Sequence, residues 1–146
     1  MTQTTTELSL EVTQHIPFPP ERVFDAWLDP KMMAKFMIPG PDMDPPSVTN
    51  DPRVGGAFQV IMKPPGVDGG LPHDGKYLVI DRPSRLQFTW VSAFTQDDST
   101  VTLDFVANGA GTDVTLTHVR FPNDESRDNH KMGWGAILGK MQGALS

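Results

Sequence analysis

Cysteine is absent from this chain of 146 residues, which excludes disulfide bonds and thiolate metal sites. No apolar run approaches the ~20 residues that a membrane-spanning helix needs, so we expect no membrane insertion. Residues 1–7 are polar and lack the basic and apolar segments of a secretion signal. Together these absences favour a cytoplasmic location.

Basic side chains are also few, with 12 Lys and Arg against 18 Asp and Glu and a formal net charge of −6. This balance lacks the basic surface that binds nucleic acid, so we expect no nucleic acid partner. The 14 prolines and 13 glycines fall mostly between periodic segments and indicate loops. A chain of this size is typical of one domain, and we interpret residues 1–146 as a single domain.

The N-terminal part predicts one strand and two short helices. Apolar and polar residues alternate over residues 7–15, which is typical of a half-buried strand. Pro20 suits the first position of a helix, where its missing N–H is harmless. Asp29 repeats this start signal as the N-cap of a second short helix over residues 31–36. Residues 37–52 are rich in proline and predict a loop with room for a short strand.

The remainder predicts a run of strands and then a long helix. Five further strands are expected at residues 57–63, 75–81, 85–93, 99–107 and 112–120. The short turns between the later ones predict antiparallel pairing. Asn123 or Asp124 can cap the final helix, whose apolar residues from His130 to Leu145 lie on one stripe. The order predicts an α+β fold in which a curved antiparallel sheet surrounds this helix.

A sheet of six to seven strands is wider than one helix, whose diameter is about 10–12 Å. If the sheet curls around the helix, room for a small apolar molecule remains between them. Strand phase and helix spacing predict the residues that would line this interior. These candidate ligand-binding residues are Trp27, Phe36, Phe58, Tyr77, Phe88, Trp90, Leu103, His118, His130, Trp134 and Leu138. The alternative is that the same residues form a packed core.

Two histidines and the single tyrosine are the candidate polar groups of the interior. His118 is in phase with its apolar neighbours and is expected to point inward, as a ligand anchor, as a general acid or base, or as a core histidine with hydrogen-bond partners. His130 lies one turn before Trp134 and either approaches His118 or faces solvent. Tyr77 either donates to a ligand carbonyl or has a structural partner.

Catalytic and cofactor signatures are missing. Two histidines without a well-placed third ligand do not make a metal site, and we assign no metal. The glycine pairs Gly55–Gly56 and Gly69–Gly70 lack the spacing of nucleotide-binding loops, so we assign no cofactor. No serine lies in a G-x-S-x-G motif, and we assign no catalytic residue.

The final helix has one unusual face. Gly135, Gly139 and Gly143 recur every four residues, opposite the apolar stripe, although each interior glycine costs about 1 kcal/mol of helix propensity. A solvent face would normally carry Glu and Lys at these positions. We interpret this small-residue face as a surface that packs against a twin helix in a homodimer; the alternative is tolerated drift on an exposed face.

The residues Phe18–Pro20 and Val23–Pro30 resemble the opening of the activator-of-heat-shock-ATPase-like family, a branch of the START-like (SRPBCC) helix-grip superfamily. Further segments similar to its signatures follow in order: Arg53–Phe58, Gly75–Tyr77, Asp81–Pro83, Arg85–Trp90, Gly111–Thr112, Thr115–His118 and Gly133–Trp134. One departure is Lys35–Pro39, which stands where family members often carry tryptophan ahead of a proline. The match covers nearly the whole chain.

The resemblance implies a helix-grip architecture with a hydrophobic cavity, and hence a small apolar partner that is lipid-like, aromatic or polyketide-like. Two other functions stay open. One is a cyclase or dehydratase that uses the same cavity. The other is a stress- or chaperone-associated interaction protein. Because few residues precede the first predicted strand, we do not expect the upstream domain of eukaryotic cochaperones of this family.

Overall fold

The computed structural model of the chain describes residues 8–40, 42–95 and 98–146. Glu7, where the first predicted strand begins, lies outside these residues. The elements in chain order are β1 (Ser9–Ile16), α1 (Pro20–Ala26), α2 (Pro30–Phe36), β2 (Asp44–Asn50), β3 (Ala57–Lys63), β4 (Leu71–Asp81), β5 (Arg85–Thr89), β6 (Thr100–Asn108), β7 (Gly111–Val119) and α3 (Asp124–Leu145). This order confirms the predicted fold class.

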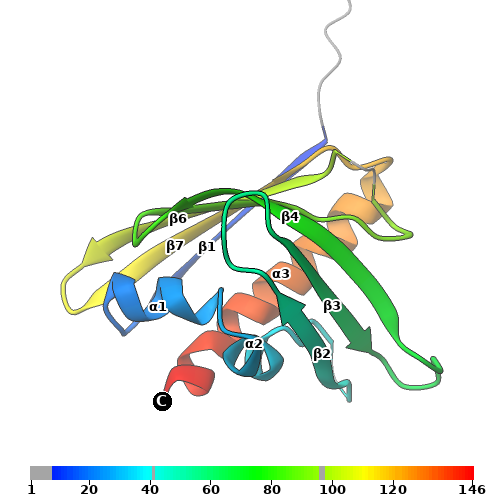
Figure 1. The fold of residues 1–146 in the computed structure, drawn as a ribbon, viewed down its shortest axis with the longest axis horizontal. Helices are drawn as coiled ribbons and strands as arrows, with labels where there is room; N and C mark the ends of the chain where they lie inside the picture. The colour runs from blue at the N-terminus through cyan, green and yellow to red at the C-terminus, as the bar shows by residue number, and fades with distance from the viewer. Residues whose placement is uncertain (1–7, 41, 96–97) are drawn as a thin grey trace, which may run out of the picture.

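The strands form one antiparallel sheet of seven strands in the order β1-β7-β6-β5-β4-β3-β2. Figure 1 shows this sheet curling over α3, with α1 and α2 on the same side as the helix. Helix α3 packs most extensively on β1, which is an edge strand of the sheet, and on α2. Strands β3 and β4 run away from α3 (Figure 1), and the site described below lies between these strands and the first half of the helix.

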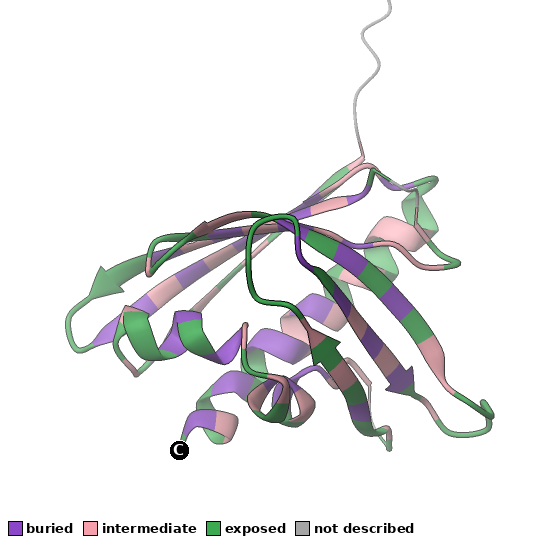
Figure 2. Cartoon of the chain, in the orientation of Figure 1, coloured by how far each residue is buried: buried purple, intermediate pink, exposed green. Residues whose placement is uncertain are grey.

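The core lies between the sheet and α3. Figure 2 shows buried and exposed residues alternating along the strands, with the buried stripe of α3 turned toward the sheet. The residues Phe88, Leu103 and His118, predicted to face the interior, are buried, and the residues in phase with them on β5, β6 and β7 are buried too. These residues are Leu86, Phe88, Val101, Leu103, Phe105, Val114, Leu116 and His118.

Two strands differ from the prediction, and a third forms where the prediction left room for a short strand. Strand β2 forms within the predicted loop despite Pro45 and Pro46, since it is an edge strand whose register shifts at these prolines. Strand β4 begins at Leu71 instead of residue 75, because pairing with β3 extends it through the Gly/Pro-rich segment. Strand β5 ends at Thr89, after which Val91 bridges to Asp74 across the sheet.

Helix α3 begins where the sequence predicts. The side chain of Asn123 accepts a hydrogen bond of 2.8 Å from the backbone N–H of Ser126, which caps the first turn. Among the described residues, no helix combines the length and the apolar character needed to cross a membrane. On the outward face, a Cβ placed at Gly135, Gly139 or Gly143 would meet no atom within 4 Å. The described part of the chain therefore puts nothing against these three positions, and the homodimer stays a prediction.

Candidate functional site

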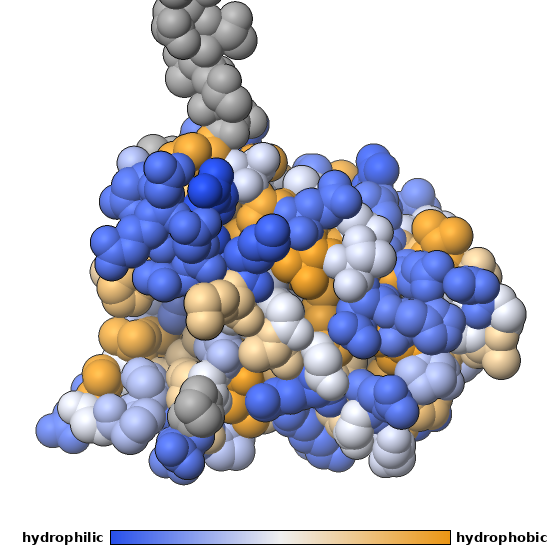
Figure 3. Space-filling view, turned by 180° about the vertical axis from the view of Figure 1, so that it is seen from behind, coloured by the Kyte–Doolittle hydropathy of each residue, from blue (hydrophilic) through white to orange (hydrophobic). Residues whose placement is uncertain are grey.

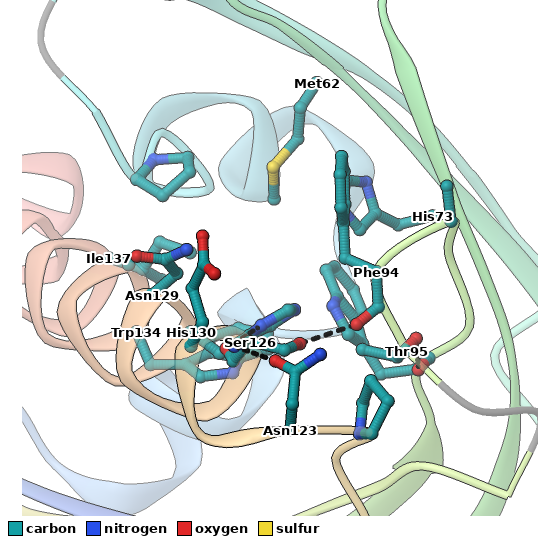
Figure 4. A pocket seen from close by; sticks show the side chains of 16 residues that line it. Met62, His73, Phe94, Thr95, Asn123, Ser126, Asn129, His130, Trp134 and Ile137 are labelled. Carbon is teal, nitrogen blue, oxygen red and sulfur yellow. Dashed lines mark hydrogen bonds between the residues drawn. The ribbon is translucent and has the colours of Figure 1, made fainter.

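A pocket of about 620 Å³ lies between the first half of α3 and the diverging strands β3 and β4 (Figure 4). The segment between β5 and β6 forms its third wall. The described residues that line it are Pro39, Met62, His73, Trp90, Ala93, Phe94, Thr95, Pro122, Asn123, Glu125, Ser126, Asn129, His130, Gly133, Trp134 and Ile137. A volume in this range is typical of small-molecule sites.

The apolar floor of the pocket consists of two tryptophans from different elements. The ring centroids of Trp90 and Trp134 are 5.0 Å apart, and both side chains are buried in the core. The His73 ring stacks on Trp90, with a centroid distance of 4.9 Å. Met62 and Ile137 complete the apolar surface, so the floor offers aromatic and aliphatic contact to a ligand.

The wall between β5 and β6 is tied to the helix by hydrogen bonds. The Ser126 hydroxyl donates to the carbonyl of Phe94 at 2.6 Å, and Figure 4 shows this bond beside the Asn123 cap. The Thr95 hydroxyl donates to the carbonyl of Trp90 at 2.9 Å, which closes the turn on itself. Phe94 remains 50% exposed, so an aromatic side chain lies at the mouth of the pocket.

His118 lies beneath the floor in a fully enclosed hydrogen-bond network. The indole N–H of Trp134 donates to its Nδ1 at 3.0 Å, so this nitrogen carries no proton. The Nε2–H therefore donates to the hydroxyl of Ser99, at 2.5 Å. Burial, and to a smaller extent the neighbouring His130, lowers the pKa of His118 from 6.5 to about 3. The ring is neutral at pH 7, and both of its nitrogens have protein partners.

His130 is a polar residue of the lining with one ring nitrogen that has no protein partner among the described residues. Its Nδ1 lies 2.7 Å from the carbonyl of Ser126, and because a carbonyl only accepts, this nitrogen carries the proton. Nε2 is then an acceptor, and it has no hydrogen-bond partner among the described residues. The side chain is partly exposed and lines the pocket. The ring centroids of His130 and His118 are 5.3 Å apart, so of the two alternatives for His130 the structure has the approach to His118.

Burial also lowers the pKa of both pocket histidines. For His130 it outweighs the carbonyl of Ser126, which raises the pKa. For His73 it outweighs the raising effects of the Leu71 and Val60 backbones, and His130 lowers the pKa further. Nδ1 of His73 donates to the carbonyl of Leu71 at 3.0 Å. Both rings are therefore neutral at pH 7, and neither supplies a positive charge.

Three of the predicted ligand-binding residues, Trp90, His130 and Trp134, line the pocket. The other eight are buried in the core outside its lining: Trp27, Phe36, Phe58, Tyr77, Phe88, Leu103, His118 and Leu138. Tyr77 has a protein partner, since its hydroxyl accepts a hydrogen bond of 3.1 Å from the side chain of Asn50. Their role in ligand binding stays a prediction.

Several residues of the pocket escaped the sequence analysis. His73 was assigned to a loop, whereas it lies inward on β4 with Gly75 and Tyr77. His73, Gly75 and Tyr77 are spaced two residues apart, which is typical of one face of a strand. A β-bulge after Tyr77 interrupts this alternation in the rest of β4, so the pattern is short. Phe94, Ser126 and Asn129 carry no pattern that points inward, because only the packing of the loop against α3 brings them together.

A metal site and a second pocket are the other candidates among the described residues. Within the described ranges, no group of three or more His, Asp or Glu residues is arranged to hold a metal ion. A second hollow lies beside the loop at residues 64–70, lined by Ile61 and Val67 and by polar, proline and glycine residues without an aromatic floor. The pocket beside α3 is therefore the candidate site.

Comparisons with known proteins agree with the fold. The family model described as Activator of Hsp90 ATPase homolog 1-like protein matches residues 17–146. Protein CV1439 from Chromobacterium violaceum has a similar structure, with a TM-score of 0.81 at 22% identity, over 94% of this chain and 96% of that one. An AHSA1-like protein from Aeromonas hydrophila has a TM-score of 0.79 at 24% identity, over 94% and 92%.

A more distant neighbour is PFC0360w, an HSP90 activator from Plasmodium falciparum, with a TM-score of 0.68 at 24% identity over 86% of each chain. Likenesses at this level of identity show the fold alone. No curated protein matches the sequence. The family model, in contrast, spans the two helices, strands β2 to β7 and α3. The chain therefore belongs to the Activator of Hsp90 ATPase homolog 1-like family.

Proposed function

We propose that this protein binds a small hydrophobic molecule in the pocket between α3 and strands β3 and β4. The observation that carries the proposal is the paired Trp90 and Trp134 floor of a pocket of about 620 Å³. Such a pocket resembles small-molecule sites, which combine apolar lining with a few placed polar groups. Affinity comes mainly from the apolar surface of the ligand that the pocket removes from water.

The same geometry gives less support to an enzyme. His118 was the first candidate for acid–base chemistry, but Trp134 and Ser99 occupy both of its nitrogens. A general acid or base must come within hydrogen-bond reach of a bound substrate. His130 has a free acceptor nitrogen, and among the described residues no hydrogen bond joins it to the other titratable side chains of the lining, His73 and Glu125.

The proposal is tested with N-phenyl-1-naphthylamine, an uncharged dye whose fluorescence rises in apolar surroundings. Gly133 lines the pocket, and Gly135 on the opposite side of α3 has open space around it. In Gly133→Phe a ring enters the pocket, and we expect at least tenfold weaker dye binding. In the matched control Gly135→Phe we expect the affinity of the unmodified protein.

Thermal unfolding of both variants by circular dichroism shows whether they are folded. Saturable dye binding that Gly133→Phe weakens and Gly135→Phe does not would support the pocket. Absence of saturable binding to the unmodified protein would contradict the proposal. If Gly133→Phe and Gly135→Phe are both folded and lose dye affinity equally, the dye does not bind in this pocket.

A further inference from the structure

The charge of the pocket lining restricts the ligand more sharply than its shape does. Of the described residues that line the pocket, Glu125 is the one acidic side chain, and no lysine or arginine is among them. The neighbouring Arg127 points its guanidinium at acidic partners on its own helix, Asp124 at 3.5 Å and Asp128 at 3.1 Å. A carboxylate or phosphate in the pocket would lose its hydration without gaining a cation.

The polar side of the pocket instead offers an acceptor. His130 donates through Nδ1 to the Ser126 carbonyl, which leaves the Nε2 lone pair for an incoming donor. Burial keeps the pKa of His130 below its ordinary value, so the ring does not turn into a cation at pH 7. Figure 4 shows His130 on the α3 wall, near Trp134 of the floor and across the pocket from His73.

Resting on the proposed function, we infer that the ligand is an uncharged aromatic molecule with a hydroxyl group, which donates to Nε2 of His130 while its ring fills the pocket beside Trp90 and Trp134. A ligand that covers Nε2 of His130 without donating to it leaves a buried acceptor unsatisfied, which costs binding free energy. The site therefore prefers a phenol to the bare hydrocarbon. The absence of a lining cation disfavours the corresponding acid. The site therefore discriminates by both hydrogen bonding and charge.

Three probes of one ring system separate these effects: naphthalene, 2-naphthol and 2-naphthoate, titrated at pH 7 by isothermal calorimetry. At this pH the naphthol is uncharged and the naphthoate is ionised. We expect 2-naphthol to bind about fivefold more tightly than naphthalene and at least about tenfold more tightly than 2-naphthoate.

Two variants assign the discrimination to residues. His130→Phe keeps an aromatic ring but removes the acceptor, and we expect it to bring 2-naphthol within about twofold of naphthalene. Glu125→Lys places a cation at the rim, and we expect it to strengthen 2-naphthoate binding relative to the other two probes. The matched control is His15→Phe, the same change at a half-exposed histidine of β1 outside the pocket lining, which should alter none of the ratios.

A second measurement needs no variant. Imidazole nitrogen NMR of the unmodified protein should show the Nε2 resonance of His130 moving when 2-naphthol is added and not when naphthalene is added. If naphthalene binds but 2-naphthol gains nothing, or if 2-naphthoate binds most tightly, the inference on ligand chemistry is overturned and the proposed function stands. If none of the three probes binds, both are overturned.

Discussion

The indole N–H of Trp134 and Nδ1 of His118 are joined by a hydrogen bond of 3.0 Å that links α3 to the sheet beneath the pocket. One partner belongs to the lining and the other to the closed core. The bond orients the indole that forms half of the floor, and it assigns the proton of His118 to Nε2. The histidine therefore supports the pocket from below instead of reaching into it.

The first prediction concerns Ser99, whose hydroxyl accepts from Nε2–H of His118 in a fully buried environment. Ser99→Ala leaves this donor unsatisfied, and we expect the free energy of unfolding to fall by about 1–3 kcal/mol. Urea denaturation followed by circular dichroism measures the change. The control is Ser9→Ala at an exposed position of β1, expected to stay within about 0.5 kcal/mol. Equal effects of the two variants would show that the network contributes nothing.

The second prediction concerns pH. His118 is fully buried, and its pKa falls from 6.5 to about 3 on folding, so the unfolded chain binds the proton more tightly. Stability is therefore fully present above pH 6.5 and is lost as the pH falls toward 3, by about 1.4 kcal/mol per pH unit from this group. Urea denaturation at pH 7.0, 6.0 and 5.0 measures the slope.

The variant His118→Gln gives the control for this slope, because glutamine keeps an acceptor for Trp134 and does not titrate. Its unfolding free energy at pH 7 is expected to be lower, but its decline between pH 6.0 and 5.0 should be shallower by about 1 kcal/mol. An unchanged slope would assign the acid sensitivity to other groups, such as His73 and His130, whose pKa values burial also lowers.

The third prediction separates Tyr77 from ligand binding. Asn50 donates to the Tyr77 hydroxyl at 3.1 Å and to the carbonyl of Leu28 at 2.8 Å, which ties β2 and β4 to the turn between α1 and α2. Tyr77→Phe should lower the free energy of unfolding by about 1 kcal/mol while dye affinity changes less than about twofold. A large loss of dye affinity in a folded Tyr77→Phe protein would return this tyrosine to the site.

The fourth prediction tests the small-residue face of α3. Figure 3 shows the molecule from behind, with hydrophobic and near-neutral residues interspersed among hydrophilic ones. Because a Cβ at Gly135, Gly139 or Gly143 meets open space, alanine at each should raise the free energy of unfolding by about 0.5–1 kcal/mol in a monomer. Urea denaturation of the triple variant measures the sum.

The opposite outcome would favour the homodimer. If a twin helix packs on this face, the added methyl groups force the helices apart, and the triple variant should dissociate in sedimentation at micromolar concentration. Gly75→Ala provides the contrast, since its Cβ would lie 2.0 Å from the carbonyl of Thr89. That substitution should be destabilising by at least about 1–3 kcal/mol in either case.

Local patterns in the sequence were sufficient for most elements. The alternation through Leu103 and Leu116 predicted which faces of β6 and β7 are buried, because successive side chains of a strand point to opposite sides. Asp29 and Asn123 predicted the starts of α2 and α3 through caps that involve only neighbouring residues. These features depend on chain geometry over a few residues.

Only the tertiary structure decided the site. His118 has two hydrogen-bond partners, Ser99 and Trp134. They lie 19 and 16 residues away from it in the chain, and no local spacing selects them. His73 joins the pocket because β4 pairs with β3 beyond the predicted strand start, and Phe94 joins it because Ser126 holds its carbonyl. The sequence by itself determined the periodic elements, which local backbone geometry dictates. The pocket depends on how far the curved sheet diverges from α3, which is set by long-range packing.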